Sequence, residues 1–366
     1  MYWAVFCIFL LLMFREINTK KICKFSFWFT YIILVCLIVL RKGQGTDYYN
    51  YELIYDSIKS IDDVRLLLLK KDFGFACLNY WAIQLNISYE FFVAIFAFVT
   101  MLLFFPFFYI ICNKSMIPLF FFYTTFYLVY PFSGIRQGFT LAVLLGILYP
   151  LLTKKKYTYY IFVTLLCSLV HMSILICLVL PFIYHMRISW KIIYFVFAFF
   201  TVVLYLDLNF LHFFSITIDR IHTGESSSMK YIAKTVRVLV ILPIFLVPKS
   251  IYNDRDLLGI RNILLMGFVV YSLFSFNELT SSRLGVYFRV FEGLFIMMLI
   301  YRTCLKKLNY QILFAMSIFA SVFFVKDINS FLIQAGYKNC NLLSYPYLSV
   351  FHDESTIFYY RTVISD

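Results

Sequence analysis

The amino-acid sequence predicts an all-α, polytopic integral membrane protein. Of its 366 residues, 63% are hydrophobic and only 14% are charged, whereas a soluble domain has about 25% charged residues. The mean hydropathy is +0.85. Apolar runs of about 15–25 residues recur along the chain, and a helix needs this length to cross a bilayer. These observations exclude a soluble globular protein.

Eleven apolar runs predict about ten transmembrane helices and one re-entrant hairpin. No internal repeat or low-complexity linker divides the chain, so we expect a single membrane domain of residues 1–366. The first run has no basic segment before it and no small-residue cleavage site, so we interpret it as a retained span. The runs lie at 1–14, 25–40, 89–112, 116–131, 134–152, 157–184, 190–206, 236–248, 262–276, 284–301 and 309–325.

Three polar segments are predicted to lie on the outer face of the membrane. The turn Arg15–Lys24 carries four basic residues and one acidic residue, which predicts a cytoplasmic position and an N-terminus outside. Counting the spans onward from this turn places two loops, 41–90 and 207–235, and the C-terminal tail 326–366 outside.

The run 157–184 is the predicted re-entrant hairpin, with His171 at its outward tip. With this hairpin, the inner loops carry 16 of the 32 Lys and Arg residues and only three acidic residues, so they hold the whole net charge of +13. Basic residues are enriched in cytoplasmic loops in this way. Each arm, 157–170 and 171–184, spans only about 20 Å, so the tip lies below the outer surface. The alternative is a single span with a later helix inverted.

The charge and the cysteines exclude several other classes of protein. The basic residues occupy short loops between spans, and no phosphate-binding glycine loop or nucleic-acid-binding module is present, so we expect no nucleic-acid partner. Nine scattered cysteines without a C-x-x-C pair indicate no metal or redox site. The D-x-D at Asp254 lies in a basic cytoplasmic loop and is interpreted as a solvated turn. His212 and His222 lack the spacing of metal ligands, so we predict no metal.

Six short motifs follow one another along the chain. They are G-T-D-Y-Y-N-Y from Gly45, D-F-G-F from Asp72, I-R-Q-G from Ile135, H-x-S from His171, R-L-x-x-Y-F from Arg283 and Y-P-Y from Tyr345. Each motif is common by itself, but the ordered set resembles the EpsG-type members of the Wzy group of polysaccharide polymerases over nearly the whole chain. The sequence departs from that pattern at Phe139-Thr140, where small residues are more usual, and at Asp72, where glutamate is common.

The resemblance implies a GT-C-like helical bundle and a glycosyltransferase that uses no nucleotide sugar. Such an enzyme transfers a growing glycan from undecaprenyl diphosphate onto a lipid-linked repeat unit at the outer face of the bacterial plasma membrane. The product is an O-antigen, a capsule or an exopolysaccharide. The implied partners are the lipid-linked oligosaccharide substrate, and a flippase and a chain-length regulator of the same pathway. No cofactor is implied.

Arg136 and Arg283 are the candidate groups for binding the diphosphate, and Arg136 is also a candidate catalytic residue. Each follows a polar turn and begins an apolar helix, and a guanidinium can bind phosphate through two parallel hydrogen bonds. A helix N-terminus adds a positive dipole end. The alternative interpretation is an interfacial arginine whose side chain reaches the lipid head groups.

His171 and Asp47 are the candidate catalytic bases for the attacking sugar hydroxyl. Histidine has a near-neutral pKa that suits proton transfer, although His171 could instead form a structural bond across helices through Ser173. Asp47 is flanked by tyrosines, which suit either sugar stacking or a membrane interface. The further candidates for substrate binding lie in the same motifs and are Tyr48, Asp72, Gln137, Ser173 and Tyr287.

Two other functions are weighed against polymerisation. A flippase or transporter for the lipid-linked glycan is expected to show internal repeats and mid-span charges along a pathway. A membrane O-acyltransferase that modifies a surface glycan also uses a buried histidine. That function leaves Arg136 and the aspartate–tyrosine loop without a role.

The hairpin predicts that residues 185–190 face the cytoplasm. In a variant without native cysteines, single cysteines introduced there should react with a membrane-impermeant maleimide only after the cells are permeabilised. A cysteine introduced at Asn50, in the outer loop, is the positive control for labelling of intact cells. Labelling of residues 185–190 from outside would show that the run 157–184 is a single span.

Overall fold

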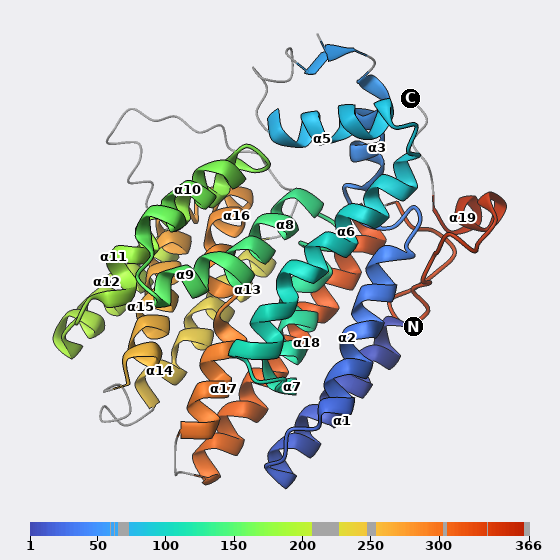
Figure 1. The fold of residues 1–366 in the computed structure, drawn as a ribbon. Helices are drawn as coiled ribbons and strands as arrows, with labels where there is room; N and C mark the ends of the chain where they lie inside the picture. Colours follow the sequence, from blue (N-terminus) through green and yellow to red (C-terminus); the bar gives the residue numbers. More distant parts are fainter. Residues whose placement is uncertain are drawn as a thin grey trace. The chain divides into compact units, whose positions relative to one another are not determined.

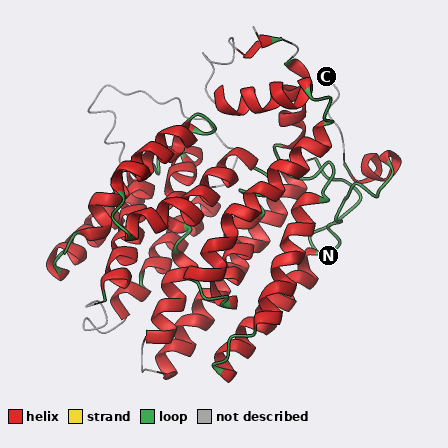
Figure 2. Cartoon of the chain, viewed as in Figure 1, coloured by secondary structure: helices red, strands yellow, loops and turns green. Residues whose placement is uncertain are grey.

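The computed structural model describes residues 1–366 except 59, 62, 65–72, 207–226, 247–253, 303–305, 335 and 362–366. All regular structure in the described residues is helical, and no β-strand occurs among them (Figure 2). The predicted all-α class is therefore confirmed. The chain divides into two compact units: unit 1 comprises Met1–Leu175 and Ala320–Asp366, and unit 2 comprises Ile176–Phe319. The number of domains stays a prediction.

Unit 1 contains the N-terminal helices and the C-terminal end of the chain (Figure 1). Its elements are α1 (Tyr2–Thr19), α2 (Lys24–Val39), α3 (Tyr48–Ser57), α5 (Phe73–Gln84), α6 (Tyr89–Pro106), α7 (Met116–Phe122), α8 (Ile135–Val143), α9 (Tyr149–Thr153), α10 (Tyr157–Ser168) and α19 (Glu354–Tyr360). Three π-helical turns, η1 (Phe107–Ile111), η2 (Tyr123–Tyr127) and η3 (Leu144–Leu148), continue α6, α7 and α8.

Unit 2 contains the helices in the middle of the sequence. They are α11 (Leu180–His185), α12 (Trp190–Leu206), α13 (Ser227–Ile241), α14 (Pro243–Leu246), α15 (Arg255–Leu273), α16 (Glu278–Arg289) and α17 (Glu292–Arg302). The 3₁₀ helix η4 (Met172–Val179) and the helix α18 (Lys306–Gln334) run across the boundary between the two units. In unit 2, α15 packs against α11, α12, α13, α16 and α17 and forms the centre of the unit.

Six helical stretches in the described part of the chain are long and apolar enough to cross a membrane. They are Tyr2–Thr19, Tyr89–Ile111, Ile135–Thr153, Arg255–Leu273, Leu279–Arg302 and Tyr310–Ile333. Five shorter apolar helices are Lys24–Val39, Met116–Tyr127, Tyr157–Ser168, Met172–His185 and Trp190–Leu206. Ten of the eleven predicted runs coincide with these stretches. The exception is the run 236–248, which falls on α13, α14 and two residues outside the described part. The polytopic membrane fold is thus confirmed, whereas the number of spans stays a prediction.

Several helices extend past the predicted ends of the apolar runs. The run 1–14 was expected to end before Glu16, but α1 continues to Thr19. Glu16 is buried because it accepts hydrogen bonds from the Ser115 hydroxyl, at 2.5 Å, and from the Met116 N–H, at 2.7 Å. A carboxylate at the start of α7 satisfies N–H groups that have no partner within that helix. The boundary prediction was wrong because a charged residue can lie inside a span when it caps a neighbouring helix.

The C-terminal tail also begins later than predicted. Residues 326–334 were assigned to an outer tail, but α18 continues through them to Gln334. Ile328 and Phe331 are buried on the same face of the helix as Phe324, which is the spacing of an amphipathic helix. The single Lys326–Asp327 pair is therefore too short an interruption to end the helix.

The run 157–184 is interrupted where the hairpin was predicted to turn. Helix α10 ends at Ser168, residues 169–171 are not helical, and the chain resumes as η4 and then α11. His171 is the last residue of this turn, as predicted for the tip. The direction in which the second arm crosses the membrane stays a prediction.

Gly138, the glycine of I-R-Q-G, is required by close packing at the start of α8. A Cβ atom at this position would lie 2.5 Å from the Cα and 2.7 Å from the N of Pro131, which is too close for any side chain. The turn that precedes α8 can therefore fold back onto the helix only when residue 138 is glycine. This turn fixes the position of Arg136, two residues earlier.

Gly138→Ala is expected to lower the stability of the purified protein by about 1–3 kcal/mol, because overpacking forces the backbone to move. Gly285→Ala on α16 is the matched control, since the nearest atoms to its Cβ would lie 3.9 Å away and alanine favours a helix. Thermal unfolding in detergent measures the difference. Equal loss of stability in both variants would contradict the packing argument.

Candidate functional site

Five of the six sequence motifs lie in unit 1. The loop before α3 carries Asp47, the first turn of α8 carries Arg136, the start of α5 carries Gly74, and the turn after α10 carries His171. The contacts between these segments show which of the motifs lie close enough to form one site.

The Asp47 loop packs directly against the turn that leads into α8. The Thr46 N–H donates a hydrogen bond to the Ser133 Oγ at 2.8 Å, and the two hydroxyl groups lie 2.6 Å apart. Gly45 has a φ of +107° and approaches the Phe132 carbonyl so closely that a Cβ atom would lie 3.2 Å from it. The Asp47 Oδ2 lies 3.9 Å from the position of a Cβ at Gly134. The carboxylate is therefore held beside the residue that precedes α8.

Arg136 lies in the first turn of α8 and is half-buried between two aromatic rings. Its Cζ is 5.2 Å from the centroid of Tyr51 and 5.6 Å from that of Phe75, distances at which a cation is attracted to the ring faces. Burial raises the pKa of the Tyr51 hydroxyl, and the positive charge of Arg136 opposes this rise. These rings hold the guanidinium at the mouth of the helix. The next residue, Gln137, is buried.

The turn that carries His171 contacts the same cluster through its backbone and a neighbouring side chain. The Gly74 N–H donates a hydrogen bond to the Leu169 carbonyl at 2.7 Å, and a Cβ at Gly74 would lie 3.0 Å from Leu169. Val170 packs against a buried cluster that includes Tyr51, Phe75 and Ile135. His171 and Ser173 follow at once and are half-buried. The structure thus brings the Asp47 loop, Arg136 and the His171 turn around one aromatic cluster.

The sixth motif, Y-P-Y, fixes the Asp47 loop from the other side. Gln44 donates a hydrogen bond to the Pro346 carbonyl and accepts one from the Tyr2 hydroxyl, both at 2.9 Å. Arg361 donates to the carbonyls of Gly43 and, at 3.1 Å, Gly45. Sequence reasoning missed this role of the tail, because the contacts join segments that are about three hundred residues apart.

Arg41 is a buried cation that sequence reasoning also missed. It is 4% exposed, and its Cζ lies 4.8 Å from the centroid of the Phe132 ring, four residues before Arg136. Among the described residues, its Nε and Nη1 atoms have no hydrogen-bond partner. Burial lowers the pKa of Arg41. A guanidinium in such an environment is costly unless an anion compensates it, so Arg41 is a second candidate for binding phosphate.

Two further polar residues of unit 1 were not predicted. Asn79 on α5 is 1% exposed, and neither atom of its amide has a partner among the described residues. It lies one helical turn after Phe75, on the same buried face, and an amide can both donate to and accept from a sugar hydroxyl. Glu52 on α3 is half-buried, and burial, followed by the charges of Asp56 and Glu90, raises its pKa.

The ring of Tyr48 does not offer a face to a sugar. It is 4% exposed and packs edge-on against Tyr89 with centroids 5.2 Å apart. Tyr89 in turn donates a hydrogen bond to the Tyr48 carbonyl. The tyrosines at the start of α3 therefore stabilise the loop, and a stacking contact of Tyr48 with substrate is not supported by its position.

Arg283 and Tyr287 belong to unit 2. The prediction that Arg283 begins a helix was wrong, because Asn277 caps α16 by accepting a hydrogen bond from the Thr280 N–H. Arg283 therefore lies in the second turn of α16, where it is exposed, and Tyr287 is fully buried.

The D-x-D at Asp254 has a structural role. Asp254 accepts hydrogen bonds from the N–H groups of Asp256 and Leu257 at the start of α15 and forms an ion pair with Arg302. Asp256 accepts a hydrogen bond from the Tyr184 hydroxyl at 3.0 Å. Within the described ranges, no three His, Cys, Asp or Glu residues are grouped as metal ligands. The candidate Asp72 and the histidines His212 and His222 lie outside the described residues.

Comparison with protein-family models gives a match to the EpsG family over residues 24–349. The match covers both units and includes all nine candidate residues named from the sequence. No curated protein and no solved structure matches the chain. Because the match covers most of the chain, the protein belongs to the EpsG family and is a polysaccharide polymerase-like membrane protein.

Proposed function

We propose that the protein polymerises a surface polysaccharide at the outer face of the bacterial plasma membrane. It transfers the growing glycan from undecaprenyl diphosphate onto the repeat unit of a second lipid-linked molecule. The observation that carries this proposal is the meeting of Asp47, Arg136 and the His171 turn around one aromatic cluster in unit 1. These residues are the cation and the bases that such a transfer requires. The inner-membrane location and the outward-facing site belong to the same proposal.

The reaction would proceed by displacement at the anomeric carbon of the donor sugar. The acceptor hydroxyl oxygen forms the new glycosidic bond, and the bond between the anomeric carbon and the diphosphate oxygen breaks. The hydroxyl proton passes to a base, and the electron pair leaves with the diphosphate. Arg136 binds this anionic leaving group, because preorganised cations stabilise charge that develops in the transition state.

Arg41 supplies a second positive charge for the same leaving group. Its ring partner Phe132 lies four residues before Arg136, so both guanidinium groups flank the turn that enters α8. Undecaprenyl diphosphate carries more than one negative charge, and two guanidinium groups match it better than one. In unit 2, Arg283 is the remaining predicted phosphate-binding residue.

Either Asp47 or His171 serves as the base. Asp47 is positioned by the contacts of Gly45 and Thr46 with Ser133. His171 is positioned by the hydrogen bond between Gly74 and Leu169, which lies two residues before His171 in the chain. General base catalysis contributes about 10²–10⁴-fold to a rate. The amides of Gln137 and Asn79 are the candidates for binding sugar hydroxyl groups.

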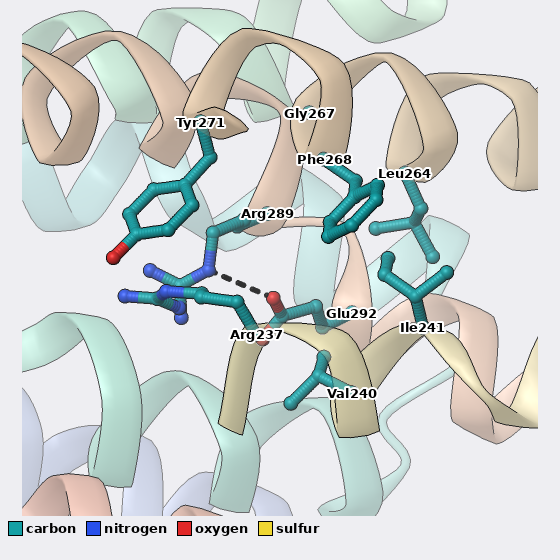
Figure 3. A pocket seen from close by; sticks show the side chains of 9 residues that line it. All are labelled: Arg237, Val240, Ile241, Leu264, Gly267, Phe268, Tyr271, Arg289 and Glu292. Carbon is teal, nitrogen blue, oxygen red and sulfur yellow. Dashed lines mark hydrogen bonds and ion pairs between the residues drawn. The ribbon is translucent and has the colours of Figure 1, made fainter. Parts of the chain in front are cut away.

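A flippase for the lipid-linked glycan is the second candidate function. The observation that favours it is an ion pair of 2.9 Å between Arg289 and Glu292, near the centre of the span Leu279–Arg302 (Figure 3). Charges at this depth are typical of transport pathways. Surface-glycan analysis separates the two functions, because loss of a flippase removes single repeats as well as long chains.

Arg136→Ala is expected to abolish the polysaccharide ladder in a deletion strain while single capped repeats remain. The cation that binds the leaving group is then missing, so elongation fails but export of single repeats continues. Gel analysis of surface glycan measures this, and Arg255→Ala, which removes an exposed arginine at the start of α15, is the matched control. A normally expressed Arg136→Ala protein that polymerises at the wild-type rate would refute the role.

Arg41→Met is expected to reduce polymerisation at least tenfold without lowering the melting temperature of the purified protein. Replacing a buried cation whose Nε and Nη1 have no hydrogen-bond partner among the described residues with an apolar side chain of similar length removes a desolvation cost, but it also removes a phosphate-binding group. Arg361→Met is the control, because it loses hydrogen bonds to Gly43 and Gly45 and should be less stable. A marked fall in the melting temperature of Arg41→Met would show that Arg41 is structural.

A further inference from the structure

The C-terminal tail contains a tight turn with an apolar tip. The turn runs from Ser349 to His352, and the His352 N–H donates a hydrogen bond to the Ser349 carbonyl at 2.9 Å. Its two central residues are Val350 and Phe351, whose side chains are 43% and 79% exposed. Glycine, proline, asparagine, aspartate and serine are the usual residues of a turn. The apolar pair at this tip therefore points to an apolar environment, and neither the family match nor the proposed function assigns it a role.

The ends of the turn satisfy each other's polar groups. The Ser349 N–H donates a hydrogen bond to the His352 Nδ1 at 3.1 Å, and the Ser349 hydroxyl lies 2.9 Å from the same nitrogen. Polar groups without a partner are costly to remove from water. These internal bonds therefore lower the cost of placing the turn where water is scarce.

The turn is attached to the end of α2. The Lys42 N–H donates a hydrogen bond to the Leu348 carbonyl at 3.1 Å, and the Val350 N–H donates one to the Leu40 carbonyl at 2.9 Å. The Tyr347 hydroxyl donates to a carbonyl in the last turn of α2 at 3.0 Å. Figure 1 shows the tail beside α2 and the start of α1. The turn thus lies at the same depth in the membrane as the end of α2.

The end of α2 lies at the boundary of the hydrocarbon core. With 16 residues, α2 is about 24 Å long, whereas the core is about 30 Å thick. Lys20, Lys21 and Lys24 hold the start of the helix at one interface. The other end of the helix therefore reaches no further than the opposite boundary between acyl chains and head groups. The attached turn is at that boundary.

The tail begins where a lipid-facing surface ends. Phe25, Phe29, Ile32 and Cys36 of α2 are exposed, and their spacing places them along one side of the helix. The carbonyl of Cys36, the last of these residues, lies 3.4 Å from the Tyr347 hydroxyl of the tail. An apolar tip at this place continues the surface that α2 presents to lipid.

We infer that the turn inserts Val350 and Phe351 into the membrane interface, at the level where the acyl chains meet the head groups. The partner is the bilayer itself, and no particular lipid is recognised. Asp353 and Glu354 follow the turn and are exposed, so their carboxylates return the chain to water at once.

The insertion would anchor the segment that holds the Asp47 loop. Arg361 donates hydrogen bonds to the carbonyls of Gly43 and Gly45, and Gln44 donates to the Pro346 carbonyl. The turn lies between Pro346 and Arg361 in the chain. A lipid contact at its tip therefore adds a fixed point between the two attachments of this loop to the tail.

The test measures the depth of a nitroxide spin label in the full-length protein in nanodiscs, by electron paramagnetic resonance. Each variant lacks the native cysteines and carries one new cysteine. Phe351→Cys is expected to be accessible to oxygen, which concentrates in the bilayer, and protected from a water-soluble nickel chelate. Ile32→Cys, on the exposed side of α2, is the control in lipid, and Asn50→Cys, exposed on α3, is the control in water. The ratio of oxygen to nickel accessibility should be several-fold higher at position 351 than at position 50.

Each outcome decides the inference. A ratio at position 351 equal to that at position 50 would show that the turn lies in water and would overturn it. Low accessibility to both reagents would show that protein covers the tip, and would overturn the lipid assignment. If Phe351→Cys does not fold, Val350→Cys tests the same turn by the same ratio. The measurement involves no polymerase activity, so this inference and the proposed function can fail separately.

Discussion

Burial of positive charge is the constraint on which this molecule depends. A guanidinium inside a membrane protein needs rings, carbonyls, an amide or a carboxylate around it, and the structure uses each of these. Arg136 lies between two aromatic rings, Arg361 donates to backbone carbonyls, Arg261 donates to the Asn262 side chain, and Arg289 pairs with a carboxylate. Arg41 lies beside the Phe132 ring, and its Nε and Nη1 have no hydrogen-bond partner among the described residues. This incomplete hydrogen bonding is the reason why an anionic ligand is proposed for Arg41.

The candidate site in unit 1 is built from short segments on a rigid frame. The spans supply the frame, and the candidate residues lie on the loops, turns and first helical turns that connect them, where binding residues are often found. Glycines at 45, 74 and 138 allow the backbone of one segment to approach another closely. The glycines in the motifs therefore serve packing, while the charged residues beside them are the candidates for binding.

The sequence sufficed to predict the helical membrane fold, nearly all the apolar stretches and the interruption at His171, because hydrophobic length is a strong signal. Motif order also predicted one site from Asp47, Arg136 and His171; the structure brings these segments around one cluster, and their joint action stays a proposal. It did not reveal Arg41 or Asn79, since burial and the absence of partners depend on packing between distant segments. Nor did it reveal the pairing of Arg289 with Glu292, because the break between α16 and α17 lies inside one continuous apolar run.

The hydrogen bond from Arg361 to the Gly43 carbonyl has a consequence for the assembly of the protein during synthesis. The two residues are 318 positions apart, so the N-terminal loop is inserted in the membrane long before its partner is synthesised. Until then, the loop lacks the hydrogen bonds that fix its carbonyls. The loop around Gly43 can therefore reach its final conformation only after Arg361 has been synthesised. A ribosome-bound or truncated chain that lacks Arg361 would have its membrane spans but not the assembled candidate site.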